Sequence, residues 1–223
     1  MANVLVFTET NNGKIKPVTL EILGKLAGQN TDVACIGDLG DDQVKVLAEY
    51  GAAKVHKLKG DNLDKYSPEG YSNALHGFIS SGNYDYVFAG ATSMAKDMLP
   101  RLATKFEAGL ASDCVNFIFE GDTFHGTRPL FAGKCLAKVE LTGPKPHFAT
   151  IRPNALGMPE SPTAGAGEAA EASVEAGEIR AAIKEIIASA SEKVDLTEAN
   201  IIVSGGRAMK NSENFSILQE MAD

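Results

Sequence analysis

The chain is poor in several features that would define a class of protein at once. It has three cysteines in 223 residues, at positions 35, 114 and 135, which are too few and too scattered for a disulfide framework or a zinc site. Each cysteine is therefore predicted to be a small core or strand residue. No basic leader with an apolar stretch and a cleavage site precedes the first apolar run, so the pattern favours a reduced, cytoplasmic setting.

Long apolar runs and an excess of positive charge are also missing. No apolar stretch approaches the ~18 residues needed to cross a bilayer. Lys and Arg total 21 against 29 Asp and Glu, which gives a net charge of -8. This charge disfavours non-specific binding to nucleic acid or to a lipid surface, because both are anionic. With 44% apolar and 22% charged residues, the chain is typical of a globular protein with a real hydrophobic core.

Catalytic and nucleotide-binding motifs are scarce. The histidines His56, His76, His125 and His147 share no metal-ligand spacing, and the sequence contains neither a Walker phosphate loop nor a serine nucleophile elbow. The segment 165–170 fits a loosened dinucleotide fingerprint, but it follows no predicted strand and is rejected. This scarcity argues against a hydrolase and is neutral for a protein whose chemistry belongs to a bound cofactor.

The first half of the chain alternates between two hydrophobic periods. Apolar segments typical of strands buried on both faces lie at 3–9, 33–36, 54–58 and 85–89, and segments of helical spacing lie at 17–29, 41–50, 68–81 and 93–106. Pro17 suits the first turn of a helix, and Gly51 suits a helix end. The alternation predicts an α/β fold with a mostly parallel sheet and helices on both faces.

The pattern changes after Gly109. Short extended runs at 114–120, 123–128, 136–141 and 148–152 are separated by Gly or Pro and predict an antiparallel meander added to the parallel sheet. Between 163 and 178, 13 of 16 residues are Ala, Gly or Glu, a composition that predicts a flexible or weakly structured connector. The segment 179–191 is open between a helix, which propensity favours, and an edge strand.

The end of the chain reads as one more strand and helix. Ala199 to Val203 is predicted to be a buried strand, and a helix from about Glu213 to Ala222 is expected, with Asn211 and Ser212 as possible caps. One strand and one helix cannot form a core alone. The pair therefore either packs on the main domain or opens a second α/β domain.

Two glycine-containing loops are candidates for binding. Ser204-Gly-Gly-Arg207 lies between the last strand and helix, where glycines allow close backbone approach and an Arg can pair with a phosphate. Its alternative is a glycine-rich turn with a solvated Arg. Gly90-Ala-Thr-Ser93, followed by Lys96 and Arg101, lies where open α/β sheets bind nucleotides. Its alternative is a threonine or serine that only caps a helix.

Two arginines, Arg128 and Arg152, each precede a proline, which biases them toward an extended conformation. They mark either a ligand or subunit surface, or solvated strand ends.

Several phrases, taken in order, resemble one family. They are Asn3-Val-Leu-Val-Phe-Thr-Glu9, Gly90-Ala-Thr-Ser-Met-Ala-Lys-Asp-Met-Leu-Pro-Arg101, Gly109-Leu-Ala-Ser-Asp-Cys114, Thr127-Arg-Pro-Leu-Phe-Ala-Gly133, Ile151-Arg-Pro-Asn154 and Ser204-Gly-Gly-Arg207. Each phrase is weak singly, but the ordered set resembles the alpha subunits of electron-transfer flavoproteins over essentially the whole chain.

The resemblance implies an electron-transfer protein rather than an enzyme. It implies a heterodimer in which residues 1–188 form an N-terminal scaffold that docks on a beta subunit carrying AMP, and 189–223 begin the C-terminal FAD-binding domain. It implies that FAD accepts electrons from acyl-CoA or other flavin dehydrogenases, as in fatty acid β-oxidation. A quinone oxidoreductase or similar acceptor would pass the electrons toward the respiratory chain. In the family, the region matching 180–188 is extended.

At residue level the resemblance implies that Gly206 and Arg207 bind the cofactor. The next residue is Ala208, where the family usually has Gly. The family also continues well past Asp223, so most of the FAD-binding domain is expected to be missing. Two rival hypotheses are a nucleotide-binding α/β enzyme that uses the loop at Gly90, and a flavin-free interaction module.

Overall fold

The computed structural model describes residues 1–11, 13–181, 183–185, 199 and 201–222. The chain divides into two compact units, Met1–Glu185 and Ile186–Asp223. The predicted domain boundary between 188 and 189 lies outside the described residues.

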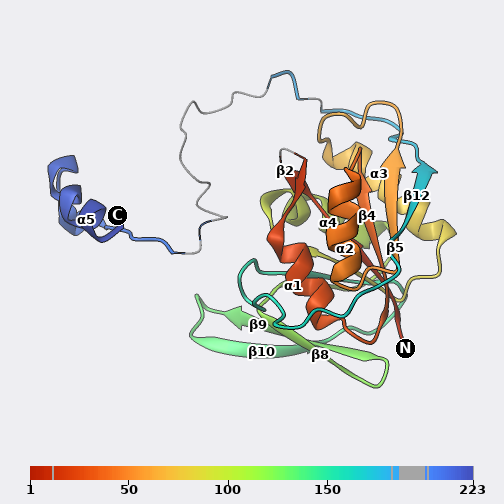
Figure 1. Ribbon diagram of the computed structural model, residues 1–223, viewed down its shortest axis with the longest axis horizontal. Helices are drawn as coiled ribbons and strands as arrows, with labels where there is room; N and C mark the ends of the chain where they lie inside the picture. Colours follow the sequence, from red (N-terminus) through yellow and green to blue (C-terminus); the bar gives the residue numbers. More distant parts are fainter. Residues whose placement is uncertain (12, 182, 186–198, 200, 223) are drawn as a thin grey trace. The chain divides into compact units, whose positions relative to one another are not determined.

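The first unit carries most of the secondary structure (Figure 1). Its elements are, in order, β1 (Asn3–Phe7), β2 (Thr10–Asn11), β3 (Lys14–Ile15), α1 (Pro17–Lys25), β4 (Asn30–Ile36), α2 (Asp41–Glu49), β5 (Lys54–Lys59), α3 (Pro68–Ser81), β6 (Tyr86–Gly90), α4 (Ser93–Lys105), β7 (Leu110–Cys114), β8 (Asn116–Glu120), β9 (Thr123–Leu130), β10 (Cys135–Glu140), β11 (His147–Ile151) and β12 (Glu168–Ser173). The second unit contains two short 3-10 helices, η1 (Arg207–Met209) and η2 (Ser212–Phe215), and the helix α5 (Ser216–Ala222).

The predicted parallel sheet is confirmed. Seven strands pair in the order β12-β5-β4-β1-β6-β11-β7, and every pairing is parallel. The predicted helices are present, and α1, α3 and α4 begin at the prolines and capping residues that mark a helix start in the sequence. Pro17 begins α1, and the Ser67 side chain caps α3 by accepting from the backbone N–H of Gly70.

The sheet is buried on both faces, as the sequence of its central strand requires. In β1, Val4 and Val6 belong to the apolar cluster shared with α1 and α2, whereas Leu5 and Phe7 belong to the cluster shared with α3 and α4. Successive side chains of a strand point to opposite faces. A continuous apolar run therefore fits a central strand covered by helices on either side.

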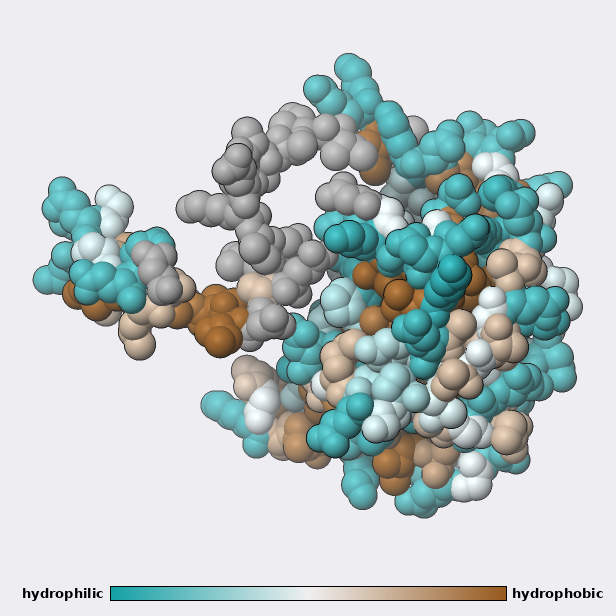
Figure 2. Space-filling model, in the orientation of Figure 1, coloured by the Kyte–Doolittle hydropathy of each residue, from teal (hydrophilic) through white to brown (hydrophobic). Residues whose placement is uncertain are grey.

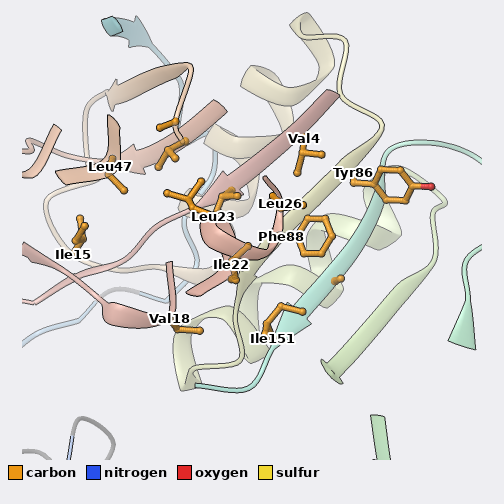
Figure 3. Packing of buried hydrophobic residues seen from close by; sticks show 14 of the residues in the cluster. Val4, Ile15, Val18, Ile22, Leu23, Leu26, Leu47, Tyr86, Phe88 and Ile151 are labelled. Atoms are coloured by element: carbon orange, nitrogen blue, oxygen red, sulfur yellow. The ribbon is translucent and has the colours of Figure 1, made fainter. Parts of the chain in front are cut away.

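A small antiparallel sheet covers the rest of the first face. It contains β8, β9 and β10 in the order β10-β9-β8, so the predicted meander is confirmed for three of its four runs. Phe117 of β8 and Phe124 of β9 meet Phe88 of the main sheet, with ring centroids 5.0 and 5.6 Å from it. Figure 3 shows Phe88 among Tyr86, Leu26 and Ile151 in this core.

The placement of the fourth run in the meander is wrong. The run at 148–152 becomes β11, a parallel strand between β6 and β7, with all five residues buried. Such complete burial is typical of interior parallel strands and not of a meander with one solvated face.

The predicted flexible connector is also wrong over part of its length. Residues Glu168–Ser173 form β12, which extends the sheet by pairing with β5. Its glutamates meet lysines of that strand, with Lys59 Nζ 2.6 Å from the carboxylate of Glu171. Gly165 approaches the carbonyl of Ala52 so closely that an added Cβ would lie 2.2 Å from its oxygen. Here glycine permits close backbone packing rather than flexibility.

The second unit differs from its prediction at one element. Residues 199 and 201–203 are not in a strand, whereas the predicted helix is present as η2 followed by α5. Ile201 and Ile202 are 86% and 55% exposed. A strand needs a neighbour to receive its backbone hydrogen bonds, and the described residues of this unit contain no other strand. Of 180–188, residues 180, 181 and 183–185 are not in a strand, and the others lie outside the described residues.

The beginning of β11 makes the stability of the fold sensitive to pH. His147 is 5% exposed, and its Nδ1 finds no hydrogen-bond partner among the described residues. Burial lowers the pKa of this imidazole; the nearby Lys145 acts in the same direction and Asp85 in the opposite one. The folded state therefore binds fewer protons than the unfolded state. The stability is complete above the unfolded pKa and is lost as pH falls through the folded one.

We therefore expect the free energy of unfolding to fall as the pH drops below about 6.5, by at most about 1.4 kcal/mol per pH unit for this one proton. Urea unfolding of the wild type and of His147→Gln between pH 5 and 8 checks this, and the substituted protein should show the flatter profile. Parallel profiles for the two proteins would show that His147 contributes nothing to the pH dependence.

Candidate functional site

The glycine loop of the second unit is the first candidate site. Gly205 packs inside this unit, because a Cβ added to it would lie 2.6 Å from Leu218 and 2.7 Å from Met209. Gly206 has open space where a Cβ would lie. Arg207 is exposed and begins η1. The loop therefore has one glycine that the fold requires and one that leaves its backbone accessible.

Arg207 is available for a ligand as far as the described residues show. No described carboxylate lies within ion-pair distance of its guanidinium. A guanidinium beside an accessible glycine backbone is a donor set that suits a phosphate or diphosphate. The prediction that Gly206 and Arg207 bind a cofactor remains a prediction. Asn211, expected as a cap, makes no side-chain capping bond at η2.

The second candidate lies at the carboxyl ends of β1 and β6, where the strand order reverses. Thr92 caps α4, its Oγ1 accepting from the backbone N–H of Ala95 at 3.1 Å, and its hydroxyl donates to the Glu9 carboxylate. Beside them, the Thr8 and Thr19 hydroxyl oxygens lie 2.8 Å apart. Burial raises the pKa of Glu9, against the lowering effects of the Thr92 hydrogen bond and Lys16.

This crevice is filled by the protein itself. The space between Glu9, Thr92 and Val18 does not admit a water molecule, and a Cβ on Gly90 would lie 2.4 Å from Val18. Small-molecule sites in proteins are typically about 300–1,000 Å³. The helix-cap interpretation of Thr92 is therefore confirmed, and a nucleotide does not fit this arrangement.

The cations that follow this loop are held by carboxylates outside the crevice. Lys96 Nζ lies 3.7 Å from Asp113, and Arg101 lies 4.0 Å from Glu69 and 3.8 Å from Asp97. Each of these two cations therefore has an acidic partner within the protein.

The two arginines that precede prolines have different surroundings. Arg152 forms a fork on Asp113, donating from Nη2 at 2.7 Å and from Nε at 3.2 Å. This hydrogen bonding, together with Lys96, lowers the pKa of Asp113 despite its partial burial. Asp113 has a φ of 57°, a left-handed conformation that Asp adopts more readily than most residues other than glycine. Arg128 has no such partner among the described residues, and its Nε is buried without a hydrogen bond.

One cavity was not anticipated from the sequence. It has a volume of about 490 Å³ and is lined by the loop from Asn62 to Ser67 and by Gly177, Ile179 and Ile183. Lys65 Nζ donates to the carbonyl of Ile183 at 3.4 Å, and this bond joins the two segments that line the cavity. The loop and the segment that enclose it are more than a hundred residues apart in sequence, so no local motif marks it.

The described residues hold no group of three or more His, Cys, Asp or Glu side chains suited to a metal ion. The three cysteines are core or strand residues, as predicted: Cys35 and Cys114 are buried, and Cys135 is an exposed residue of β10. All three are free thiols. Within the described part of the chain, no helix is both long and apolar enough to span a bilayer.

Comparison with known proteins gives a consistent result. Residues 4–178 match the Electron transfer flavoprotein domain family. The chain is 36% identical to the electron transfer flavoprotein subunit alpha of Bacillus subtilis, over 99% of this chain and 69% of that protein. It is 32% identical to the subunit of the same name from Thermoanaerobacterium thermosaccharolyticum, over 99% and 70%. It is also 27% identical to the LctC subunit of a lactate dehydrogenase (NAD(+),ferredoxin) from Acetobacterium woodii, over 99% and 54%.

Proposed function

Since the chain belongs to the electron transfer flavoprotein family, we propose that it is the alpha subunit of a heterodimeric electron carrier that binds FAD. The observation that carries this proposal is the 36% identity to a protein of that name over 99% of this chain. The similarity therefore extends past the family match, which ends at residue 178, and includes the Ser204–Arg207 loop.

The two units have different roles in this proposal. The first unit and its parallel sheet form the scaffold that docks on a beta subunit, which carries AMP. The second unit opens the FAD-binding domain, where Gly206 and Arg207 hold the diphosphate of FAD through the backbone and the guanidinium. FAD, when bound, supplies the ability to store and release electrons. The chain's own part is to bind and orient that group.

The electron donors and acceptors complete the proposal. Acyl-CoA or other flavin dehydrogenases in the cytoplasm would reduce the carrier, and a quinone oxidoreductase or similar acceptor would take the electrons toward the respiratory chain. The relative from Acetobacterium woodii bears the name of a lactate dehydrogenase subunit. A dehydrogenase acting on a substrate other than acyl-CoA is therefore a second donor to test.

The test is co-expression of this chain with a beta subunit, reconstitution with FAD, and absorbance spectroscopy of the purified complex. We expect flavin bands in the wild type and a loss of FAD affinity of about tenfold or more in Arg207→Met, because one charge-assisted contact is removed. Arg180→Met is the matched control, since Arg180 is a 77% exposed arginine paired with Glu178. It should leave the FAD affinity unchanged.

Three results would separate the hypotheses. A complex with beta that has no flavin bands after reconstitution would refute the carrier and favour a flavin-free interaction module. If calorimetry showed that this chain alone binds AMP or ATP, the nucleotide-binding enzyme would be favoured. That result would also contradict the conclusion that the crevice at Glu9 is filled. Equal FAD affinity for the wild type and Arg207→Met would remove Arg207 from the site while leaving the carrier in place.

A further inference from the structure

The cavity of about 490 Å³ lies at the carboxyl ends of two neighbouring strands of the first unit. β5 and β12 pair in parallel, and Lys59 and Ser173, their last residues, lie opposite one another (Figure 1). The loop 60–67 leaves β5 toward α3, a second segment leaves β12, and the cavity opens between the two. We call it the β5–β12 cavity. Open α/β sheets bind ligands at this end of their strands, and the volume lies within the range of small-molecule sites.

Both walls of the β5–β12 cavity are held in place by the fold. Where they begin, a Cβ on Gly60 would lie 2.1 Å from the carbonyl oxygen of Val174. Further along, Asn73 of α3 donates to the carbonyl of Ala176 at 2.7 Å. Ile179 then packs against the apolar cluster that α3 and α4 share with the sheet. The cavity is therefore a preformed space, because neither wall can move without breaking these contacts.

Two polar residues of the loop wall already have hydrogen-bond partners. The Ser67 hydroxyl accepts from the first turn of α3, and the Tyr66 hydroxyl donates to the Asp97 carboxylate at 2.9 Å. The Tyr66 ring also packs edge-on against Tyr71, with ring centroids 5.1 Å apart. These side chains shape the wall and leave the recognition of a ligand to others.

Asp64 and Lys65, also on the loop wall, keep unused hydrogen-bonding capacity. Neither takes part in an ion pair with any residue that the structure describes. The bond from Lys65 to the carbonyl of Ile183, at 3.4 Å, is longer than the usual range for an N–H donor. An ammonium has three donors, and a carboxylate has several acceptor sites. The loop wall thus offers one negative and one positive group side by side.

The opposite wall is mainly apolar. It consists of Gly177, Ile179 and Ile183. The charged residues beside Ile179 in the sequence, Glu178 and Arg180, pair with each other at 3.5 Å. Figure 2 shows apolar and hydrophilic surface side by side along the upper edge of the first unit. A ligand between the two walls would meet opposite charges on one side and two isoleucines on the other.

We propose that the β5–β12 cavity binds a small zwitterion, an α-amino acid with a large apolar side chain, whose ammonium pairs with Asp64 and whose carboxylate pairs with Lys65. Its apolar side chain lies against Ile179 and Ile183. A zwitterion is favoured over a polyanion such as a phosphate ester, because Asp64 repels additional negative charge beside Lys65. The site goes beyond the proposed function, since it belongs to the first unit alone and needs neither FAD nor a beta subunit.

The experiment measures binding of three probes to the full chain by calorimetry. They are L-phenylalanine, 3-phenylpropanoate, which lacks the ammonium, and 2-phenylethylamine, which lacks the carboxylate. We expect L-phenylalanine to bind with a Kd of about 0.1–1 mM, because Asp64 and Lys65 are exposed and exposed ion pairs are weak. Each probe that lacks one charge should bind about fivefold more weakly.

Three variants test whether the named side chains contact the probe. Asp64→Asn should weaken L-phenylalanine by about fivefold and bind 3-phenylpropanoate at least as well, because the ammonium has lost its partner. Lys65→Met should likewise bind 2-phenylethylamine at least as well as L-phenylalanine. Ile183→Ser should weaken all three probes by about tenfold, since apolar contact is lost.

Each variant has a matched control outside the cavity. Asp61→Asn changes an exposed residue of the same loop that does not line the cavity. Lys45→Met changes an exposed lysine of α2, and Met158→Ser changes an apolar side chain that is 48% exposed. The controls should bind L-phenylalanine within about twofold of the wild type. Thermal unfolding verifies that every variant is folded.

Three other results would overturn the inference. No binding of L-phenylalanine up to about 10 mM would show that Asp64 and Lys65 are only solvated loop residues. If either single-charge probe bound the wild type as tightly as L-phenylalanine, the pairing with both charges would be wrong. Equal affinity for L-phenylalanine in the wild type and all three variants would place its binding outside this cavity. Each of these results leaves the proposed FAD carrier standing, since absorbance of the complex with a beta subunit tests that separately.

Discussion

Replacing Glu21 with alanine is expected to lower the free energy of unfolding by about 3 kcal/mol, because three backbone donors lose one shared carboxylate. Glu21 lies in α1 and is 3% exposed. Its two carboxylate oxygens accept from the backbone N–H groups of Asn154, Leu156 and Gly157 at 3.0, 3.1 and 3.2 Å. These residues form the turn that follows β11, so one side chain fixes a loop more than a hundred residues away.

The conservative substitution sharpens this prediction. Glu21→Gln keeps one acceptor oxygen but turns an amide toward a backbone donor, so we expect a loss of about 1–2 kcal/mol. Glu49→Ala, at an exposed position of α2, is the control and should change stability by less than about 0.5 kcal/mol. Urea unfolding monitored by circular dichroism provides the measurement. If all three substitutions lowered the free energy of unfolding by the same small amount, water would replace the Glu21 carboxylate as hydrogen-bond acceptor with no loss of stability.

Truncating Phe88 to alanine is expected to remove about 3–5 kcal/mol of stability. This ring in β6 is 0% exposed and packs against Phe117 and Phe124, so it joins the main sheet to the antiparallel one. A cavity left there separates two layers that cannot both move to fill it. The measurement is the midpoint and slope of the urea transition, compared with the wild type.

Two further substitutions make this result specific to packing. Phe88→Leu retains most of the apolar volume and should lose about 1–2 kcal/mol. Phe131→Ala removes an identical ring from a position that is 78% exposed and should change stability by less than about 0.5 kcal/mol. If Phe88→Ala and Phe131→Ala were equally stable, the aromatic contacts between the two sheets would not support the fold.

Much of the fold could be predicted from local patterns. Helices α1, α3 and α4 begin at a proline or after a capping Ser or Thr, which can be recognised in the sequence. Helix α2 follows Gly40 instead. The strands of the sheet centre are continuous apolar runs, and such runs are stable only between two covering layers. Secondary structure with strong local signals was therefore predictable, together with the parallel arrangement.

The neighbours of the later strands could not be predicted in the same way. β11 and the meander strands are similar short extended runs, but β11 is inserted between β6 and β7. β12 has the composition of a linker and becomes ordered because β5 offers it an unpaired edge. Which strand pairs with which depends on contacts between distant residues, and composition carries little information about them.

The candidate sites likewise combine features that local sequence predicts with contacts between distant residues that it does not predict. Thr92 was recognisable as a cap, but Glu9, which lies in the crevice beside it, comes from the segment between β1 and β2, 83 positions away. Arg128 and Arg152 have the same local signal, an arginine before a proline. In the structure, Arg152 pairs with Asp113, whereas the Nε of Arg128 has no hydrogen-bond partner among the described residues.

The amino-acid sequence by itself determined the α/β class, the helix starts, the central strands and the family, because periodicity, capping and ordered motifs are properties of neighbouring residues. Only the tertiary structure decided that the crevice beside Thr92 is filled, that β12 belongs to the sheet and that Arg128 has no acidic partner among the described residues. These are distances between residues far apart in the chain, and burial and charge pairing are set by such distances once the layers have packed.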